Sequence, residues 1–217
     1  MFAKSILEIS QLCIKLQCMF YELLVGLTGA ASFLFILWRR LKEDYASSII
    51  FTGGFLVLSG LAIAWGVSRI FMPRWWFWLD VLAISLALGF AIFRFKMKTF
   101  EVLDAAVSAA FPWLILAFLF DSVRMKNIYS LGGFFVILAI YLLYHFLNAS
   151  YKRFSWYRSG RVGFSGLAAI AILLSLRSLT SLFFVDMLSF VGRQDAIISG
   201  SIAFLAFLGI FHLSRQT

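Results

Sequence analysis

The stretch AILLSLRSLTSLFF, residues 171–184, is apolar almost throughout, but it has Arg177 near its middle and contains no acidic residue. It belongs to a longer apolar run, and about 20 such residues in a helix cross the roughly 30 Å hydrocarbon core of a bilayer. An arginine at mid-membrane costs roughly 2.5–3.5 kcal/mol on insertion scales. The stretch therefore predicts a membrane helix whose arginine faces a polar interior or extends to the lipid headgroups.

The composition of the whole chain is that of a membrane protein. Of 217 residues, 63% are hydrophobic and 13% are charged, and the mean hydropathy is +0.96, far above the usual range of soluble domains. Polar residues form short islands between long apolar runs, and the chain has only two prolines. This pattern favours helices over the alternating strands of a membrane barrel, so we predict an all-α, polytopic membrane protein.

The apolar runs predict seven transmembrane helices. They cover about 19–38, 47–68, 75–93, 100–120, 130–148, 162–184 and 196–213, and they form a single transmembrane domain over residues 19–217. In residues 1–18, apolar residues recur at helical spacing with polar residues between them. This pattern predicts an amphipathic segment on the membrane surface, with a frayed tail as the alternative.

The basic residues indicate an orientation. The net charge is +9, but Lys and Arg lie in the connections between apolar runs, where orientation and anionic lipid explain them better than nucleic acid does. Of the 19 Lys and Arg residues, 11 lie on the side of the C-terminus and 7 on the side of the N-terminus, while Arg177 lies within a helix. By the positive-inside rule, we predict the N-terminus outside and the C-terminus in the cytoplasm.

Metal or cofactor binding is not indicated by the sequence. Cys13 and Cys18 stand five residues apart with no histidine or aspartate beside them, a spacing that matches no zinc pattern. We therefore expect no metal and no cofactor.

Acidic residues at the outer ends of other helices are candidate neighbours of Arg177. At 1.5 Å per residue, Arg177 lies about 22 Å from the inner end of its helix, in the outer half of the membrane. Glu22, Asp80 and Asp121 fall at roughly the same level. If these groups turn inward, they form a polar chamber suited to a phospholipid headgroup. The alternative is that Arg177 pairs with one acid only to hold helices together.

Asp104 and His145 have simpler explanations. Asp104 stands near the inner start of the fourth predicted helix, where a carboxylate stabilises the helix N-terminus, so we predict a structural role. His145 has no second histidine or acid at helical spacing, and we interpret it as an interfacial residue.

Four segments resemble, in order, those of the prolipoprotein diacylglyceryl transferases. These are YELLVGLTGAASFLFILWRRLKEDY (21–45), GLAIAWGVSRIF (60–71), FAIFRFKMKTFEVLDAAVSAAFP (90–112) and LLSLRSLTSLFFVD (173–186). The enzymes of that family move a diacylglyceryl group from phosphatidylglycerol to a lipoprotein cysteine at the outer face of the bacterial inner membrane. The resemblance implies the same membrane, seven helices with the N-terminus outside, phospholipid as ligand, and a lipoprotein precursor or another membrane protein as partner.

The resemblance also implies roles for individual residues. Arg177 stands at the place of the family's arginine in the sixth helix, and Asp80 is the candidate acid or base near the place of its histidine. The implied lipid contacts are Tyr21, Glu22, Arg69, Arg74 and Arg124.

Several of the family's motifs differ in this chain. FWLDVLAIS (77–85) replaces a histidine followed by two glycines, and LILAFLFDSVRMKN (114–127) has an apolar residue near the place of a second arginine. Ser181 stands where the family has a glutamate. The sequence thus predicts a divergent lipid-handling protein with two alternatives: a transferase that uses Arg177 and Asp80, or a non-catalytic lipid-binding or assembly subunit.

Overall fold

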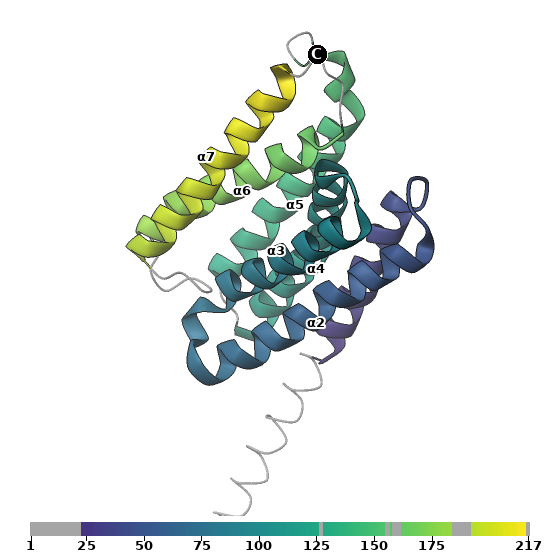
Figure 1. Ribbon diagram of the computed structural model, residues 1–217. Helices are drawn as coiled ribbons and strands as arrows, with labels where there is room; N and C mark the ends of the chain where they lie inside the picture. Colours follow the sequence, from purple (N-terminus) through teal and green to yellow (C-terminus); the bar gives the residue numbers. More distant parts are fainter. Residues whose placement is uncertain (1–22, 126–127, 155–156, 158–161, 184–191, 216–217) are drawn as a thin grey trace, which may run out of the picture.

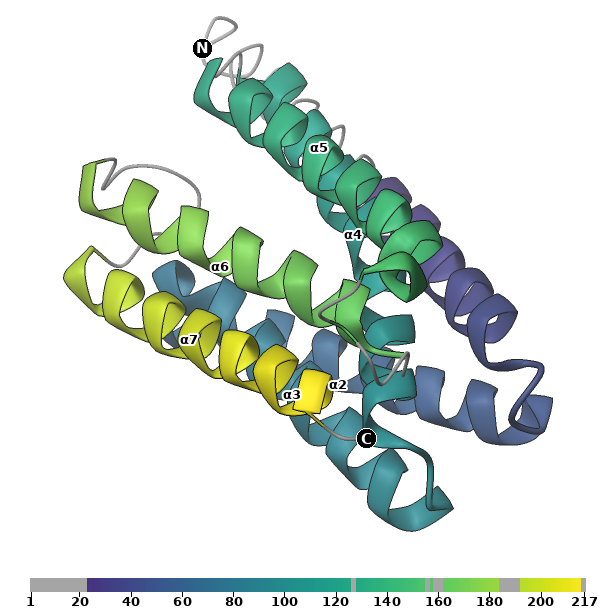
Figure 2. The ribbon, with the colours of Figure 1, turned by 90° about the horizontal axis from the view of Figure 1, so that it is seen from above.

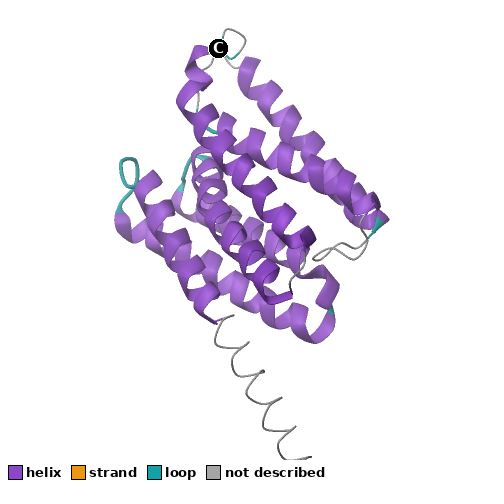
Figure 3. Cartoon of the chain, turned by 180° about the vertical axis from the view of Figure 1, so that it is seen from behind, coloured by secondary structure: helices purple, strands orange, loops and turns teal. Residues whose placement is uncertain are grey.

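Seven helices of membrane-spanning length make up most of the described structure. The computed structural model describes residues 23–125, 128–154, 157, 162–183 and 192–215. The helices are a first helix (Leu23–Leu41), α2 (Ser47–Phe71), α3 (Trp76–Phe95), α4 (Thr99–Met125), α5 (Ile128–Ser150), α6 (Phe164–Phe183) and α7 (Arg193–Arg215). Short 3₁₀ turns, η1 (Pro73–Trp75) and η2 (Tyr151–Arg153), follow α2 and α5. The prediction of an all-α chain with seven membrane-length helices is confirmed, and Figure 3 shows only helices and loops in the described part.

Most helices extend a few residues beyond the predicted ranges. The sequence predicts 47–68 and 130–148, whereas α2 continues to Phe71 and α5 runs from Ile128 to Ser150. Hydropathy marks only the hydrocarbon core, whereas backbone hydrogen bonds continue into the headgroup region, which is why the helices are longer. The predicted surface segment, residues 1–18, lies outside the described residues.

The two prolines have different structural effects. Pro73 begins η1, so the chain turns there between α2 and α3. Pro112 lies inside α4, which continues through it. A proline lacks the N–H group for a helix hydrogen bond, but neighbouring helices can compensate for this in a membrane bundle.

The helices pack mainly as antiparallel neighbours along the chain (Figure 1). The most extensive contacts join α6 with α7, α2 with α3, and α4 with α5, and α6 also packs against α4 and α5. Figure 2 shows α6 and α7 side by side, with α5 on the other side of α6. One face of α4, including Val102, Ala105 and Ala109, packs in a core with the first helix and α2.

Large apolar side chains cover the outside of the bundle. Phe93 is 87% exposed, Phe183 78% and Ile70 75%. A soluble protein would bury such residues, whereas a helix bundle in lipid exposes them to acyl chains. The exposed side chains therefore agree with the membrane-spanning length of the helices.

Candidate functional site

The guanidinium of Arg177 is held by a buried carboxylate, that of Asp195. Arg177 lies in the last third of α6, and Asp195 is in the first turn of α7, the helix that packs most closely against α6. Nε and Nη2 of Arg177 donate to Oδ1 of Asp195 at 3.3 and 3.2 Å, and Nη2 lies 3.0 Å from Oδ2. The side chain of Asp195 is fully buried and that of Arg177 is 10% exposed. The arginine therefore has a counter-charge inside the bundle.

Two aromatic residues of α3 complete this group, which we call the arginine cluster (Arg177, Asp195, Phe77 and Trp78). The indole Nε1 of Trp78 donates to Oδ1 of Asp195 at 2.5 Å. The guanidinium carbon of Arg177 lies 3.8 Å from the ring centroid of Phe77 and 5.8 Å from that of Trp78, within the range of cation–π attraction. The cluster thus joins α3, α6 and α7 near one end of the bundle.

The partner of Arg177, Asp195, is not among the three acids that depth along the helices predicts. Glu22 lies outside the described residues, and Asp121, in α4, accepts a hydrogen bond from Ser130. Asp80, in the second turn of α3, is half-buried and has no hydrogen bond or salt bridge among the described residues. A signal for Asp195 was present in the sequence, because it stands directly before the last predicted helix, at the end of the bundle where Arg177 is predicted.

The other implied lipid contacts are dispersed over the described surface. Arg69 lies at the exposed end of α2, with its guanidinium 5.0 Å from the ring centroid of Trp65. Arg74 is exposed in η1, and Arg124 is exposed in the last turn of α4. Tyr21, like Glu22, lies outside the described residues.

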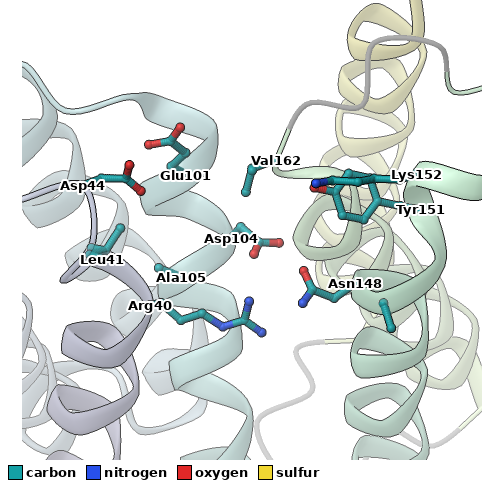
Figure 4. Close-up of a pocket in the computed structure, with 11 residues that line it drawn as sticks. Arg40, Leu41, Asp44, Glu101, Asp104, Ala105, Asn148, Tyr151, Lys152 and Val162 are labelled. Atoms are coloured by element: carbon teal, nitrogen blue, oxygen red, sulfur yellow. The ribbon is translucent and has the colours of Figure 1, made fainter.

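A second polar group lies at the opposite end of the bundle, in a cavity of about 400 Å³ between the end of the first helix, α4, the end of α5 with η2, and the turn before α6 (Figure 4). We call this cavity the polar pocket. Its polar lining consists of Arg40, Asp44, Glu101, Asp104, Asn148, Tyr151 and Lys152. These residues lie at helix ends, beside the basic connections of the chain, so the polar pocket is at one end of the membrane-length helices.

Asp104 forms the inner wall of the polar pocket and is almost completely buried. Its Oδ1 accepts hydrogen bonds from the backbone N–H of Gly166 at 2.7 Å and the hydroxyl of Ser165 at 2.9 Å, and its Oδ2 accepts one from Tyr144 at 2.9 Å. Asp104 was predicted to stabilise the N-terminus of its own helix, α4. In the structure its carboxylate lies instead at the N-terminus of α6, where free N–H groups and the helix dipole favour an anion.

Within the described part of the chain, the basic residues of the polar pocket form no salt bridge with an acid. Arg40 forms no salt bridge with any described residue, and its guanidinium carbon lies 5.4 Å from the ring centroid of Tyr144. Lys152 is exposed and likewise has no salt bridge in the described part of the chain. Glu101, by contrast, is already occupied: it accepts from Lys98 at 2.8 Å and from the hydroxyl of Tyr45 at 3.2 Å. The hydrogen bond and charge of Glu101 raise the pKa of Lys98.

Neither His145 nor any group of metal-ligating side chains forms another candidate site among the described residues. His145 lies on the exposed side of α5, with its ring 4.6 Å from that of Tyr141. Among the described residues there is no group of three or more His, Cys, Asp or Glu side chains that could hold a metal ion.

No family model, curated protein or solved structure matches this chain. The resemblance to the prolipoprotein diacylglyceryl transferases accordingly depends on the four segments quoted above.

Proposed function

We propose that this chain is a bacterial inner-membrane protein that binds phosphatidylglycerol-type phospholipid and does not transfer its diacylglyceryl group. Lipid binding is supported by the resemblance to enzymes that use phosphatidylglycerol and by the polar pocket at one end of the membrane-length helices. A transfer reaction would depend on Arg177 and Asp80. The absence of transfer is supported by the hydrogen bonds that Arg177 makes and by the lack of a hydrogen-bond partner for Asp80 among the described residues.

The observation that carries the proposal is the bonding of Arg177. An arginine that stabilises a phosphate leaving group must direct its N–H groups at the phosphate oxygens. Here Nε and Nη2 of Arg177 are directed at Asp195, whose negative charge also offsets the charge needed to attract a phosphate. Releasing the arginine would leave Asp195 buried without its counter-charge, which is strongly unfavourable.

Asp80 also lacks the surroundings expected of a base. A general base needs a partner that orients it and lies within hydrogen-bond reach of the proton to be removed. Asp80 has no hydrogen bond among the described residues, and its neighbours in sequence, Leu79 and Val81, are apolar where the transferases have a histidine and glycines.

Two measurements on the purified, full-length protein test the proposal. In the first, labelled phosphatidylglycerol and a peptide with a lipobox cysteine are incubated with the protein, and we expect no label on the peptide. Transfer that is lost in both Arg177→Lys and Asp80→Asn would replace our proposal with the transferase alternative. In the second, the lipids that co-purify are quantified by mass spectrometry, and we expect phosphatidylglycerol to be enriched over its proportion in the membrane. An equal proportion would contradict lipid binding.

A further inference from the structure

We propose that the polar pocket binds a phosphate group through Arg40, Asn148 and Lys152. The same chemistry is present in the headgroup of a phospholipid in the adjoining leaflet and in a soluble phosphate compound. The lipid source is the one that connects the polar pocket with the proposed function, but the binding chemistry does not depend on it. The site is separate from the arginine cluster, at the other end of the bundle.

Arg40 supplies the main charge. It lies in the last turn of the first helix and extends across the polar pocket toward Asn148 (Figure 4). Its guanidinium carbon lies over the ring of Tyr144, and its N–H groups have no hydrogen-bond partner among the described residues. A planar guanidinium with free N–H groups can bind two oxygens of one phosphate at once.

Asn148 and Lys152 provide donors from the opposite wall, the end of α5 and η2. Oδ1 of Asn148 lies 3.3 Å from the hydroxyl of Ser165, whose single proton it shares with the nearer Oδ1 of Asp104 at 2.9 Å. The NH₂ group of Asn148 has no partner among the described residues. Lys152, four residues further along, adds an ammonium group at the exposed rim. Donors from both walls therefore converge on the same space.

The acids of the polar pocket form no salt bridge with Arg40 or Lys152 among the described residues. Asp104 accepts hydrogen bonds from three neutral groups around it, and Glu101 accepts from Lys98 and Tyr45. Asp44 is exposed at the rim and forms no salt bridge with Arg40. A carboxylate in that position suits a phosphate that carries a hydroxyl group, such as phosphoglycerol, because the hydroxyl can donate to it. The cavity of about 400 Å³ has room for a phosphate with such a small group attached.

The test measures the thermal stability of the purified, delipidated, full-length protein in a neutral detergent. Three probes are titrated: short-chain phosphatidylglycerol, short-chain diacylglycerol without phosphate, and inorganic phosphate. A ligand that binds the folded state stabilises it by RT ln(1 + [L]/Kd), so the Tm rises with the logarithm of ligand concentration above the Kd. We expect phosphatidylglycerol to raise the Tm in this way and diacylglycerol to leave it unchanged. A response to inorganic phosphate as well means that phosphate alone is sufficient, and a response only to the lipid assigns the site to a headgroup.

The chain itself offers matched controls. Arg39 and Arg153 are exposed neighbours of Arg40 and Lys152 and do not line the polar pocket. We expect Arg40→Gln and Lys152→Gln each to weaken binding by about tenfold, as the loss of one charge-assisted hydrogen bond would. Arg39→Gln and Arg153→Gln should bind as the wild type does. If Arg40→Gln does not fold, Arg40→Lys retains the charge without the planar geometry, and Lys152→Gln tests the other wall.

The proposal is overturned if neither phosphate-bearing probe raises the Tm, if diacylglycerol acts as strongly as phosphatidylglycerol, or if the control variants weaken binding as much as the pocket variants. These results are distinct from those that test the proposed function. Transfer of label to a peptide would refute the proposed function without affecting the Tm response, and binding of inorganic phosphate alone would support the polar pocket without supporting lipid binding.

Discussion

At the scale of single residues, the burial of Arg177 is explained by its partner on α7. A buried ion pair contributes little compared with apolar residues of the same shape, but removing one partner leaves a charge in an apolar environment. Asp195 therefore stabilises the bundle chiefly by removing the penalty that Arg177 would otherwise impose. The indole of Trp78 fixes the carboxylate further and extends the effect to α3.

This explanation predicts the behaviour of Asp195→Asn. The substitution keeps the shape and the acceptor for Trp78 but removes the charge, so we expect the free energy of unfolding to fall by about 3 kcal/mol. In the double variant Arg177→Leu/Asp195→Asn no charge remains, and most of the stability should return. Unfolding in mixed detergent micelles measures both effects.

Asp80→Asn is the control for that comparison, since Asp80 is half-buried on α3 without a partner in the described structure. Its stability should be close to that of the wild type. A double variant no more stable than Asp195→Asn would contradict the explanation.

Gly166 allows the close approach of α6 and α4. A methyl group at this position would lie 2.8 Å from Oδ1 of Asp104 and 2.9 Å from its Cα, closer than packed atoms come. The Cα atom belongs to the helix backbone and cannot move without displacing α4. Gly166 also donates its N–H to Asp104, so the two helices and the carboxylate are fixed together.

We therefore expect Gly166→Ala to destabilise the protein by about 1–3 kcal/mol, the range for overpacking. Gly132→Ala is the matched control, because a methyl group there meets no atom within 4 Å and helical alanine is otherwise favoured over glycine. Thermal unfolding of the two variants measures the difference. Equal stability would show that α4 and α6 can separate without loss.

At the scale of the elements, α6 and α7 form the closest helix pair. Apart from the arginine cluster, the hydroxyl of Ser178 donates to the backbone carbonyl of Ala196 at 2.8 Å. A methyl group at Gly200 would lie 3.9 Å from Cβ of Ser178, which is within the usual Cβ–Cβ distance of a disulfide.

The cysteine pair Ser178→Cys/Gly200→Cys should therefore form a disulfide on mild oxidation, after Cys13 and Cys18 have been replaced by alanine. Trypsin cleaves after Arg193, between the two positions, so mass spectrometry of the digest detects linked peptides. The pair Ser178→Cys/Gly209→Cys, with the second cysteine more than two turns further along α7, should remain unlinked. Efficient linkage of the control pair would contradict the register of α6 and α7.

At the scale of the whole molecule, the arginine cluster and the polar pocket lie at opposite ends of the bundle. Phe77, Trp78 and Asp195 stand in the first turns of their helices, whereas Arg40 and Asn148 stand in the last turns of theirs. The distribution of Lys and Arg predicts that the end with the polar pocket faces the cytoplasm.

Reporter fusions at the C-terminus test this orientation. We expect fused green fluorescent protein to fluoresce and fused alkaline phosphatase to be inactive, because the C-terminus is predicted to be cytoplasmic. The opposite pair of results would place the polar pocket in the outer leaflet and leave the helix packing unchanged.

The sequence alone determined the number and approximate limits of the helices, because about 20 apolar residues in a row can satisfy their backbone in a bilayer only as a helix. It also placed Arg177 in a membrane helix. It did not identify Asp195, because depth along a helix says nothing about which helix lies beside it or which side of it faces inward.

The tertiary structure decided those questions. The pairing of α6 with α7 brings Asp195 to Arg177, and the meeting of the first helix, α4, α5 and the turn before α6 brings Arg40 and Asn148 to one cavity. In the sequence these residues belong to separate connections and helix ends. Arg40 contributes there only to the count of positive charges from which the orientation is predicted. Their chemistry depends on distances of a few ångströms between side chains, and such distances arise only when the helices pack.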